Sequence, residues 1–288
     1  MSDLEYMWSS TDFPFMCLVD SKRTLFLQDA IIKTIKSGDI VLDIGSGTGI
    51  LALIAAKAGA KKVYAIEFDN VLAKTLKQTI KENGFNNVIE VLNVDALKVA
   101  PFECKIDVVI SELIDTGLID ELQVPVYNHL VKTKVVDKET VFLPNRYTTY
   151  VCPINTNLEY FGFKIMAPKH NWPFYKENMT EWQIGPNYFI GEKKICSDVK
   201  FDGKLIQESQ NYSNTWIFPD KTLINSIGIY GKMYFPGMST GGEFNSLNGE
   251  KIIPFEHSLE SNTLTLDLNY NFGKGLNSLH IKTTGDTK

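Results

Sequence analysis

Two spacings of apolar residues alternate along the first half of the chain. Short apolar runs, which are typical of buried strands, occupy residues 40–44, 62–66, 88–92 and 107–111 and a segment near Val141. Around these runs apolar residues recur every three or four positions, which predicts helices at 21–36, 48–58, 71–83 and 122–132. Ser21 is the expected cap of the first helix, and Pro125 is expected to shift or kink the last. Alternating strands and helices predict a doubly wound parallel sheet with helices on both faces.

The pattern changes after Pro144. Segments 147–151, 226–235 and 263–272 are rich in β-branched and aromatic residues and are separated by Gly, Asn and Pro clusters, as in antiparallel β-structure. The stretch 161–188 has many aromatic residues and several prolines but no clear period, so it receives no assignment. We therefore expect an α/β domain over residues 1–144, with a helical segment at its start, and a mainly β domain over residues 145–288.

Composition limits the classes of function. The 288 residues suffice for two domains, and 29 basic and 34 acidic side chains leave a net charge of −5. This charge disfavours nucleic acids and anionic membranes as partners and suits a basic partner better. The start of the sequence lacks the features of a signal peptide, and the longest apolar run, 50–56, is too short to span a bilayer, so a cytoplasmic location is expected.

Cysteine spacing gives no sign of a metal centre. Four cysteines are widely scattered and form no CxxC pair: Cys17, Cys104, Cys152 and Cys196. Neither a zinc site nor a disulfide framework is expected, and the acidic residues cluster without histidines, so no metal is expected to be required.

A glycine-rich turn follows the first predicted strand. Gly45, Gly47 and Gly49 stand where a strand passes into a helix, a position at which glycine permits positive φ and close approach of a ligand. The spacing differs from the dinucleotide fingerprint, because only one residue separates the second glycine from the third. Asp43 precedes the glycines, and a carboxylate there suits a cationic ligand group and opposes a pyrophosphate.

Two further acids follow the next strands. Glu67 is placed to accept hydrogen bonds from the two hydroxyls of a ribose, and Asp95 could accept one from an adenine amino group. Each residue alone is compatible with an ordinary turn or a solvated strand end. Taken in this order, they resemble the class I S-adenosylmethionine-dependent methyltransferases, which implies S-adenosyl-L-methionine as cofactor.

An acidic loop, residues 111–121, follows the fourth predicted strand. Glu112 and Glu121 are nine residues apart with Gly117 between them, so a hairpin-like loop could bring both carboxylates to one point. Two converging carboxylates suit a guanidinium, can localise its positive charge away from one nitrogen, and can align that nitrogen with a methyl donor. Alternatively, Asp120 and Glu121 only open the next helix, where negative charge is favourable.

The acidic loop resembles the double-glutamate loop of the protein arginine methyltransferases, in which a Ser-Glu pair ends the fourth strand and a second glutamate follows nine residues later. The segments 18–24, 49–63 and 142–144 are also similar to that family, and the likeness extends over residues 16–152. The resemblance implies that Arg23 binds the cofactor's carboxylate and that Glu112 and Glu121 are catalytic. It also implies a β-barrel-like second domain that contributes to acceptor binding, and a homodimer formed through a segment near residues 155–190.

The chain departs from that family at the acceptor side. No Thr-His-Trp loop is found; residues 248–253 occupy its place, and His257 nearby is a candidate substitute. Three interpretations therefore stay open. The enzyme could methylate arginine in a protein, in a peptide or as the free amino acid; it could be a small-molecule N- or O-methyltransferase with a non-guanidino acceptor; or the protein could be a catalytically silent cofactor-binding scaffold.

Overall fold

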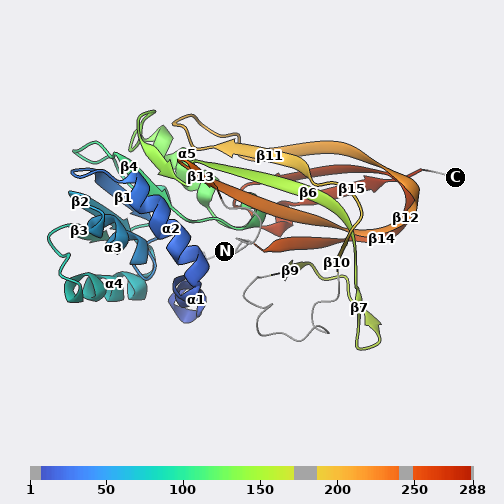
Figure 1. The fold of residues 1–288 in the computed structure, drawn as a ribbon, viewed down its shortest axis with the longest axis horizontal. Coiled ribbons are helices and arrows are strands. Elements are labelled where there is room, and N and C mark those ends of the chain that lie inside the picture. Colours follow the sequence, from blue (N-terminus) through green and yellow to red (C-terminus); the bar gives the residue numbers. More distant parts are fainter. Residues whose placement is uncertain (1–7, 172–186, 240–248, 287–288) are drawn as a thin grey trace.

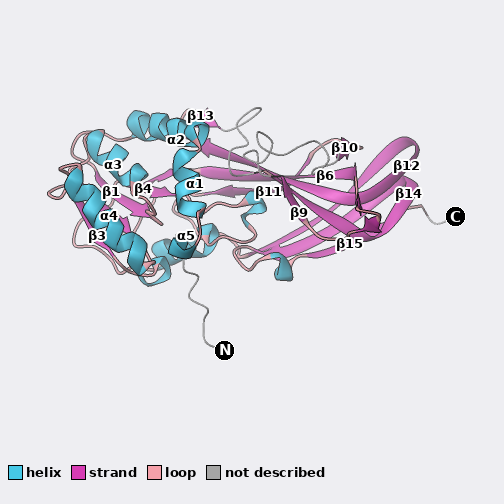
Figure 2. Cartoon of the chain, turned by 90° about the horizontal axis from the view of Figure 1, so that it is seen from below, coloured by secondary structure: helices cyan, strands magenta, loops and turns pink. Residues whose placement is uncertain are grey.

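The molecule is elongated, with an α/β unit at one end and long antiparallel strands that extend to the other (Figure 1). The computed structural model describes residues 8–171, 187–239 and 249–286. Seen from a second direction, the helices gather at one end and the strands continue away from them (Figure 2). The two kinds of structure expected from the sequence are therefore both present, in the expected order.

The α/β unit is built on a parallel five-stranded sheet in the order β3-β2-β1-β4-β5. Its strands are β1 (Ile40–Ile44), β2 (Lys62–Ile66), β3 (Ile89–Leu92), β4 (Val108–Ser111) and β5 (Val141–Leu143). The order reverses between β1 and β4, and the carboxyl ends of neighbouring strands at such a reversal form the usual ligand-binding crevice of a doubly wound sheet. Right-handed crossovers place the helices after β1 and β2 on one face and the helix after β4 on the other.

Five α-helices are described: α1 (Phe13–Val19), α2 (Ser21–Thr34), α3 (Ile50–Lys57), α4 (Asn70–Glu82) and α5 (Gln123–Lys132). Four of them match the predicted helices, and the sequence pattern missed α1. The expected cap was wrong: Asp20, not Ser21, caps α2, because its side chain accepts a hydrogen bond from the backbone N–H of Arg23 (3.0 Å). Pro125 lies in the first turn of α5, where its missing N–H removes no helical hydrogen bond.

The antiparallel sheet is dominated by three strands, β6 (Arg146–Thr156), β12 (Ser209–Phe235) and β14 (Glu250–Asn271). β12 pairs with β6 at one end and with β14 along most of its length. The predicted strands 226–235 and 263–272 are only the more apolar parts of β12 and β14. The register shifts between Ile217 and Thr222, beside Pro219 and Asp220, and this irregularity explains why a continuous strand gave an interrupted pattern.

Shorter strands complete the second half of the chain. They are β7 (Glu159–Tyr160), β8 (Phe163–Lys164), β9 (Lys169–Asn171), β10 (Asn187–Phe189), β11 (Lys194–Lys200), β13 (Met238–Ser239) and β15 (His280–Thr284). β7 and β8 form a small hairpin that projects from the sheet (Figure 1). The stretch 161–188 that received no assignment thus contains β8 and β9 and begins β10, and its residues 172–186 lie outside the described residues.

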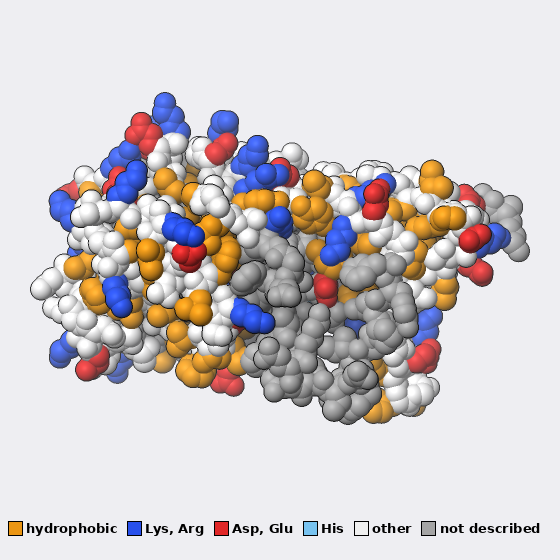
Figure 3. Space-filling model, viewed as in Figure 1, with side chains coloured by type: hydrophobic (Ala, Val, Ile, Leu, Met, Phe, Trp, Pro, Cys, Tyr) orange, Lys and Arg blue, Asp and Glu red, His pale blue; other side chains and the backbone are white. Residues whose placement is uncertain are grey.

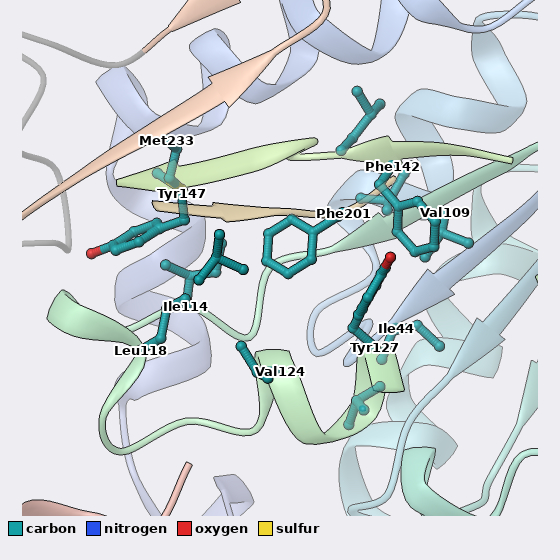
Figure 4. Close-up of a cluster of buried hydrophobic side chains, with 14 of the residues drawn as sticks. Ile44, Val109, Ile114, Leu118, Val124, Tyr127, Phe142, Tyr147, Phe201 and Met233 are labelled. Carbon is teal, nitrogen blue, oxygen red and sulfur yellow. The ribbon is translucent and has the colours of Figure 1, made fainter. Parts of the chain in front are cut away.

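One continuous hydrophobic core connects the parallel sheet to the antiparallel strands. Ile114 and Leu118 of the acidic loop point toward Tyr147 of β6, while Tyr127 of α5 lies between Phe142 and Phe201 (Figure 4). The rings of Phe142 and Phe201 pack edge-on against Tyr127, with centroids 5.0 and 5.1 Å from its ring. The acidic loop is therefore held by apolar side chains at the junction of the two sheets.

Basic and acidic side chains are scattered among apolar ones on the face of the molecule shown in Figure 3. Among the described residues, no helix combines the length and the apolar character needed to cross a membrane. The four cysteines are all free thiols. Within the same residues, no group of three or more His, Cys, Asp or Glu side chains is arranged to hold a metal ion.

Candidate active site at the carboxyl ends of β1, β2 and β4

The glycine-rich turn after β1 is tight because it lies against two neighbouring elements. Gly45, Gly47 and Gly49 have φ values of +71°, +52° and +85°, which side chains other than glycine rarely adopt. A Cβ at Gly45 would come within 2.6 Å of the Leu113 side chain, and one at Gly49 would overlap Leu76 of α4. The turn thus directly contacts Leu113 of the acidic loop, next to Glu112.

Asp43 on β1 carries a buried carboxyl oxygen that lacks a partner in the described part of the chain. Its side chain is 1% exposed, and no described residue hydrogen-bonds to its Oδ2. Burial raises the pKa of Asp43 to about 7, and the nearby charge of Glu67 adds to this effect. A buried carboxyl group of this kind is stabilised in its charged form by a cation, so the position fits the ammonium group of an amino-acid ligand.

Glu67, at the end of β2, holds the glycine turn through its side chain. Its Oε2 accepts a hydrogen bond from the Gly47 N–H (2.7 Å), and its Oε1 accepts one from the Asp69 N–H (2.8 Å). Burial raises the pKa of Glu67, and these two hydrogen bonds oppose the rise. A carboxylate oxygen has two acceptor positions, so both oxygens keep capacity for ligand hydroxyls.

Asp95 lies beyond β3 and opens the short helix η2 (Ala96–Lys98). Its Oδ1 accepts a hydrogen bond from the Leu97 N–H (2.9 Å), and its Oδ2 lies 3.6 Å from the exposed Lys98 ammonium. Asp95 therefore has a structural role as a helix cap in addition to the ligand contact expected for it.

Arg23 and Glu112 join the amino end of α2 to the end of β4. The Arg23 guanidinium forms an ion pair with the Glu112 carboxylate, and its Nη1 donates a hydrogen bond to the Cys17 carbonyl oxygen (3.1 Å). Both side chains are nearly buried, and the Arg23 Nε–H has no hydrogen-bond partner in the described part of the chain. Burial raises the pKa of Glu112, while the charge of Arg23 opposes the rise. The free Nε–H is a donor that a ligand carboxylate can satisfy.

Glu121 is the acid of the loop whose charge is least compensated. The described residues place no ion-pair partner within 4 Å of its carboxylate, although its backbone N–H donates to Asp115 Oδ1 (3.0 Å). Burial raises the pKa of Glu121 well above its ordinary value, and the charges of Glu112 and Asp115 raise it further. Burial raises the pKa of the Cys17 thiol, and the charges of Glu112 and Glu121 both contribute to the rise, so this part of α1 lies close to the two glutamates.

Two residues that sequence reasoning missed hold this loop. Gln123, the first residue of α5, is 1% exposed, and its Oε1 accepts hydrogen bonds from Ser111 Oγ and the Leu113 N–H (both 3.1 Å), the two neighbours of Glu112. Lys251, on β14, forms ion pairs with Asp115 and with Asp120 (2.5 Å). No sequence motif indicated either residue. Gln123 lies on a helix and contacts the end of a strand, and Lys251 lies more than 130 positions after its two aspartate partners.

The histidines are arranged differently from the sequence-based expectation. The His257 side chain is 86% exposed on β14, and its Nε2 lies 4.0 Å from the carboxyl group of Glu256. His170, on β9, is half-buried instead, and its Nε2 lies 3.1 Å from the carbonyl oxygen of Gly249, beside the acidic loop. Burial lowers the pKa of His170 to about 4, with the charge of Lys251 contributing, so this ring is neutral at physiological pH.

Comparison with known proteins agrees with this geometry. A family model described as ribosomal protein L11 methyltransferase (PrmA) matches residues 23–136. An uncharacterized protein of Methanocaldococcus jannaschii is 30% identical over 93% of this chain and 95% of its own length. The arginine N(omega)-methyltransferase of Streptomyces achromogenes is 34% identical over 46% of this chain, which spans only 37% of that enzyme.

Solved structures share the whole fold. The Trypanosoma brucei PRMT1 enzyme-prozyme complex with AdoHcy superposes with a TM-score of 0.69 at 16% identity, covering 96% of this chain and 98% of the other. Arabidopsis thaliana protein arginine methyltransferase 10 gives the same TM-score at 17% identity, covering 93% and 96%.

The parallel sheet, its glycine-rich turn and the matched family model define a class I methyltransferase that uses S-adenosyl-L-methionine as methyl donor. Within this class, the chain belongs to the family of the Methanocaldococcus jannaschii protein and resembles the protein arginine methyltransferases in sequence and fold.

Proposed function

We propose that this enzyme is an arginine N-methyltransferase, which transfers a methyl group from S-adenosyl-L-methionine to a guanidino nitrogen of arginine in a protein, a peptide or the free amino acid. The observation that carries the proposal is the pair of glutamates in the acidic loop, of which Glu121 has no ion-pair partner among the described residues while Glu112 is held by Arg23. The relatives support both kinds of acceptor, since one is named an arginine and others protein arginine methyltransferases.

The charge balance of the loop favours a cationic acceptor. Four acids lie in or beside it, Glu112, Asp115, Asp120 and Glu121, and two described cations, Arg23 and Lys251, form ion pairs with three of them. The remaining uncompensated carboxyl, Glu121, is one whose pKa burial raises. A guanidinium beside it would remove that penalty and keep the carboxylate charged.

For the methyl donor we assign roles to the residues around the glycine turn. Asp43 Oδ2 would accept from the donor's ammonium group and the Arg23 Nε–H would donate to its carboxylate, since both atoms are buried and lack partners among the described residues. Glu67 would accept from the ribose hydroxyls and Asp95 from the adenine amino group. Gly45, Gly47 and Gly49 would let the backbone of the turn approach the donor closely, because glycine adopts their positive φ values without strain. When bound, the donor supplies an electrophilic sulfonium methyl group.

The acceptor chemistry follows from the two glutamates. Glu112 and Glu121 would accept hydrogen bonds from the guanidinium, keep its positive charge on the nitrogens they contact, and leave lone-pair density on the nitrogen that faces the donor. Their carboxylates would also fix the orientation of that nitrogen, which lowers the entropic part of the barrier. We further propose that residues 1–144 bind the donor and residues 145–288 complete the acceptor side.

The direct test is methyl transfer from radiolabelled S-adenosyl-L-methionine to arginine-bearing peptides and to free arginine, with lysine-bearing peptides as control. We expect label on a guanidino nitrogen, located by mass spectrometry. Glu112→Gln should lower turnover by at least about a hundredfold, while calorimetry still detects donor binding. If no guanidino nitrogen becomes labelled with either acceptor, the proposal is wrong.

A second candidate is a small-molecule N- or O-methyltransferase with a non-guanidino acceptor. The observation that favours it is the segment 249–251, which contacts the acidic loop with a backbone carbonyl and a lysine rather than with a histidine side chain. Incubation with metabolite pools, followed by mass spectrometry, separates the two candidates. A catalytically silent scaffold would bind the donor in calorimetry and transfer no methyl group to either pool.

We also propose that the enzyme forms a homodimer through the β7–β8 hairpin. The hairpin projects from the sheet and presents two aromatic side chains to solvent, with Phe161 86% and Phe163 69% exposed. Large aromatic side chains at a projecting tip commonly become buried against a partner. The Trypanosoma relative is itself described as part of a heterotetrameric complex.

A further inference from the structure

We propose that Lys251 is a positioning residue, which connects β14 to the acidic loop and thereby sets the position of Glu121. This inference rests on the proposed function of the two glutamates. Lys251 comes from the antiparallel sheet, 130 positions after Glu121, and its side chain is only 4% exposed. This connection would make the position of Glu121 depend on how the antiparallel sheet packs against the parallel sheet.

The contacts of Lys251 lead to Glu121 in two steps. The Lys251 ammonium donates to Asp115 Oδ2 and to Asp120 Oδ2 (2.5 Å). The other oxygen of the same carboxylate, Asp115 Oδ1, accepts the backbone N–H of Glu121 (3.0 Å), and Asp115 Oδ2 also accepts the N–H of Ile119 (3.3 Å). A movement of the ammonium therefore moves the carboxylate that holds the backbone at residues 119 and 121.

Gly249, two positions before Lys251 and directly before β14, provides a second contact with the acidic loop. Thr116 Oγ1 donates a hydrogen bond to the carbonyl oxygen of Gly249 (2.6 Å), so residues 249–251 contact the loop at its middle as well as at Asp115 and Asp120. Lys251 is itself held in the sheet, where it pairs with Ile229 of β12 on one side and with His170 of β9 on the other. Strands paired on both sides are rigid supports for a site.

Electrostatics explains why this position needs a cation. Asp115 is 5% exposed, and burial raises the pKa of its carboxyl, whereas the charge of Lys251 lowers it. Removing the ammonium would leave Asp115 and Asp120 uncompensated beside Glu121, whose carboxyl Asp115 already repels. The same lysine thus holds the loop in place and limits the negative charge around Glu121.

The experiment compares four variants of the whole enzyme. Lys251→Met removes the charge and keeps a side chain of similar volume, whereas Lys251→Arg keeps a cation at this position. Asp115→Asn combined with Lys251→Met removes the buried charge imbalance, while the introduced amide oxygen can still accept the Glu121 N–H. Lys282→Met, at an exposed lysine of β15, is the matched control. For each we would measure kcat and acceptor KM, the Kd of S-adenosyl-L-methionine, and amide hydrogen exchange over residues 115–121.

A positioning role gives a specific set of results. Lys251→Met and the double variant should lower kcat/KM for the acceptor by roughly ten- to a hundredfold and speed exchange at Glu121, with the donor Kd within about twofold of the original. Exchange at Ile119 is compared in Lys251→Met alone, because Asp115→Asn itself removes the oxygen that accepts the Ile119 N–H. Lys251→Arg should recover most of the activity, and Lys282→Met should change nothing. If Lys251→Met does not fold, the double variant decides the matter.

Two results would overturn the inference. One is a folded double variant whose kcat and acceptor KM equal those of the original enzyme, because Lys251 would then only stabilise the fold. The other is unchanged hydrogen exchange at Glu121 in the folded variants that lack Lys251. The exchange measurement needs no methyl acceptor, so it still tests Lys251 if the original enzyme methylates no arginine and the proposed function itself fails.

Discussion

Several carboxyl groups of the site share one property, a pKa raised by burial, but they differ in what compensates their charge. Glu67 has two backbone N–H donors, Glu112 has Arg23, and Asp43 keeps one oxygen without a partner among the described residues. Buried carboxyl groups without compensation are costly unless a ligand supplies the missing charge. The least compensated groups, Asp43 and Glu121, are therefore the places where ligand cations are expected.

Asp43 should make donor binding depend on pH. Its pKa is raised to about 7, and only the charged form attracts an ammonium group, so affinity should be full above pH 7 and lost as the pH falls through it. Between pH 8 and pH 6 we expect the affinity for S-adenosyl-L-methionine to fall about tenfold, as measured by calorimetry. In Asp43→Asn the affinity should be low at both values, and an equally steep pH dependence in that variant would contradict the assignment.

Ionisation of Glu121 should lower the folding stability of the ligand-free enzyme as the pH rises. Its folded-state pKa lies well above 4.5, so from about pH 4.5 up to that raised pKa the unfolded chain binds fewer protons than the folded one, and stability falls. Glu121→Gln removes this penalty, so it should be more stable than the original by about 1 kcal/mol at pH 8 and by less at pH 4.

Chemical denaturation at the two pH values measures the difference, and the same variant should lose methyl transfer. Glu260→Gln, at an exposed glutamate of β14, is the control and should leave both stability and activity unchanged. A stability gain at Glu121 that is equal at pH 4 and pH 8 would mean that its charge is not the cause.

At the scale of elements, the sequence pattern located the helices and strands of the parallel sheet to within about two residues. Short strands that are buried on both faces leave a continuous apolar run, and the helices between them leave a period of three to four. The ends of the helices were predicted less accurately, because capping residues determine where a helix begins. Helix α3 begins at Ile50, directly after Gly49 in a left-handed conformation, and α2 begins directly after Asp20. Helix α1 was missed because it is only seven residues long and buries none of them fully.

The long strands were predictable only in part. The first part of β12, from Ser209 to Trp216, contains many polar residues and only one buried side chain, Trp216, so it resembles a loop in the sequence. Its pairing with β14 is a tertiary contact between segments far apart in the chain, which no local pattern expresses.

The glycine turn allows a matched pair of substitutions. Gly38 and Gly49 both have positive φ, but a Cβ at Gly38 would meet nothing within 4 Å, whereas one at Gly49 would overlap Leu76. Gly38→Ala should therefore cost about 1 kcal/mol of folding free energy, and Gly49→Ala about 2–4 kcal/mol. Denaturant titration would measure both costs, and calorimetry should show weakened donor binding for Gly49→Ala alone. Equal costs at the two positions would show that steric overlap with Leu76 does not limit the turn.

At the scale of the whole molecule, the β7–β8 hairpin is the feature that should control assembly. Replacing Phe161 and Phe163 together by Ser should shift the protein from dimer to monomer in analytical ultracentrifugation, because it removes the exposed apolar area at the tip. Ile217→Ser is the control, since Ile217 is also largely exposed, at 82%, but lies on β12. If the original protein is a monomer, or if the double variant still dimerises, the hairpin is not the dimer contact.

The sequence by itself determined the class of enzyme, because most residues proposed for the donor and acceptor sites belong to a few short segments whose spacing is recognisable. Gly45, Gly47, Gly49 and Asp43 belong to one strand and the turn after it, Glu67 ends the next strand, and Glu112 and Glu121 share one loop. In a parallel sheet, strand order brings such consecutive segments to one edge, so their spacing alone identifies them.

Only the tertiary structure decided what holds those residues. Lys251 reaches Asp115 and Asp120 from a strand far along the chain, and Gln123 turns back to the neighbours of Glu112 from the first residue of α5. Neither contact has a sequence signature, because a buried lysine or glutamine is distinguished from an exposed one only by the packing of distant segments. The same reason explains His170, which no sequence motif connected to the site and which the pairing of β9 with β14 places beside the acidic loop.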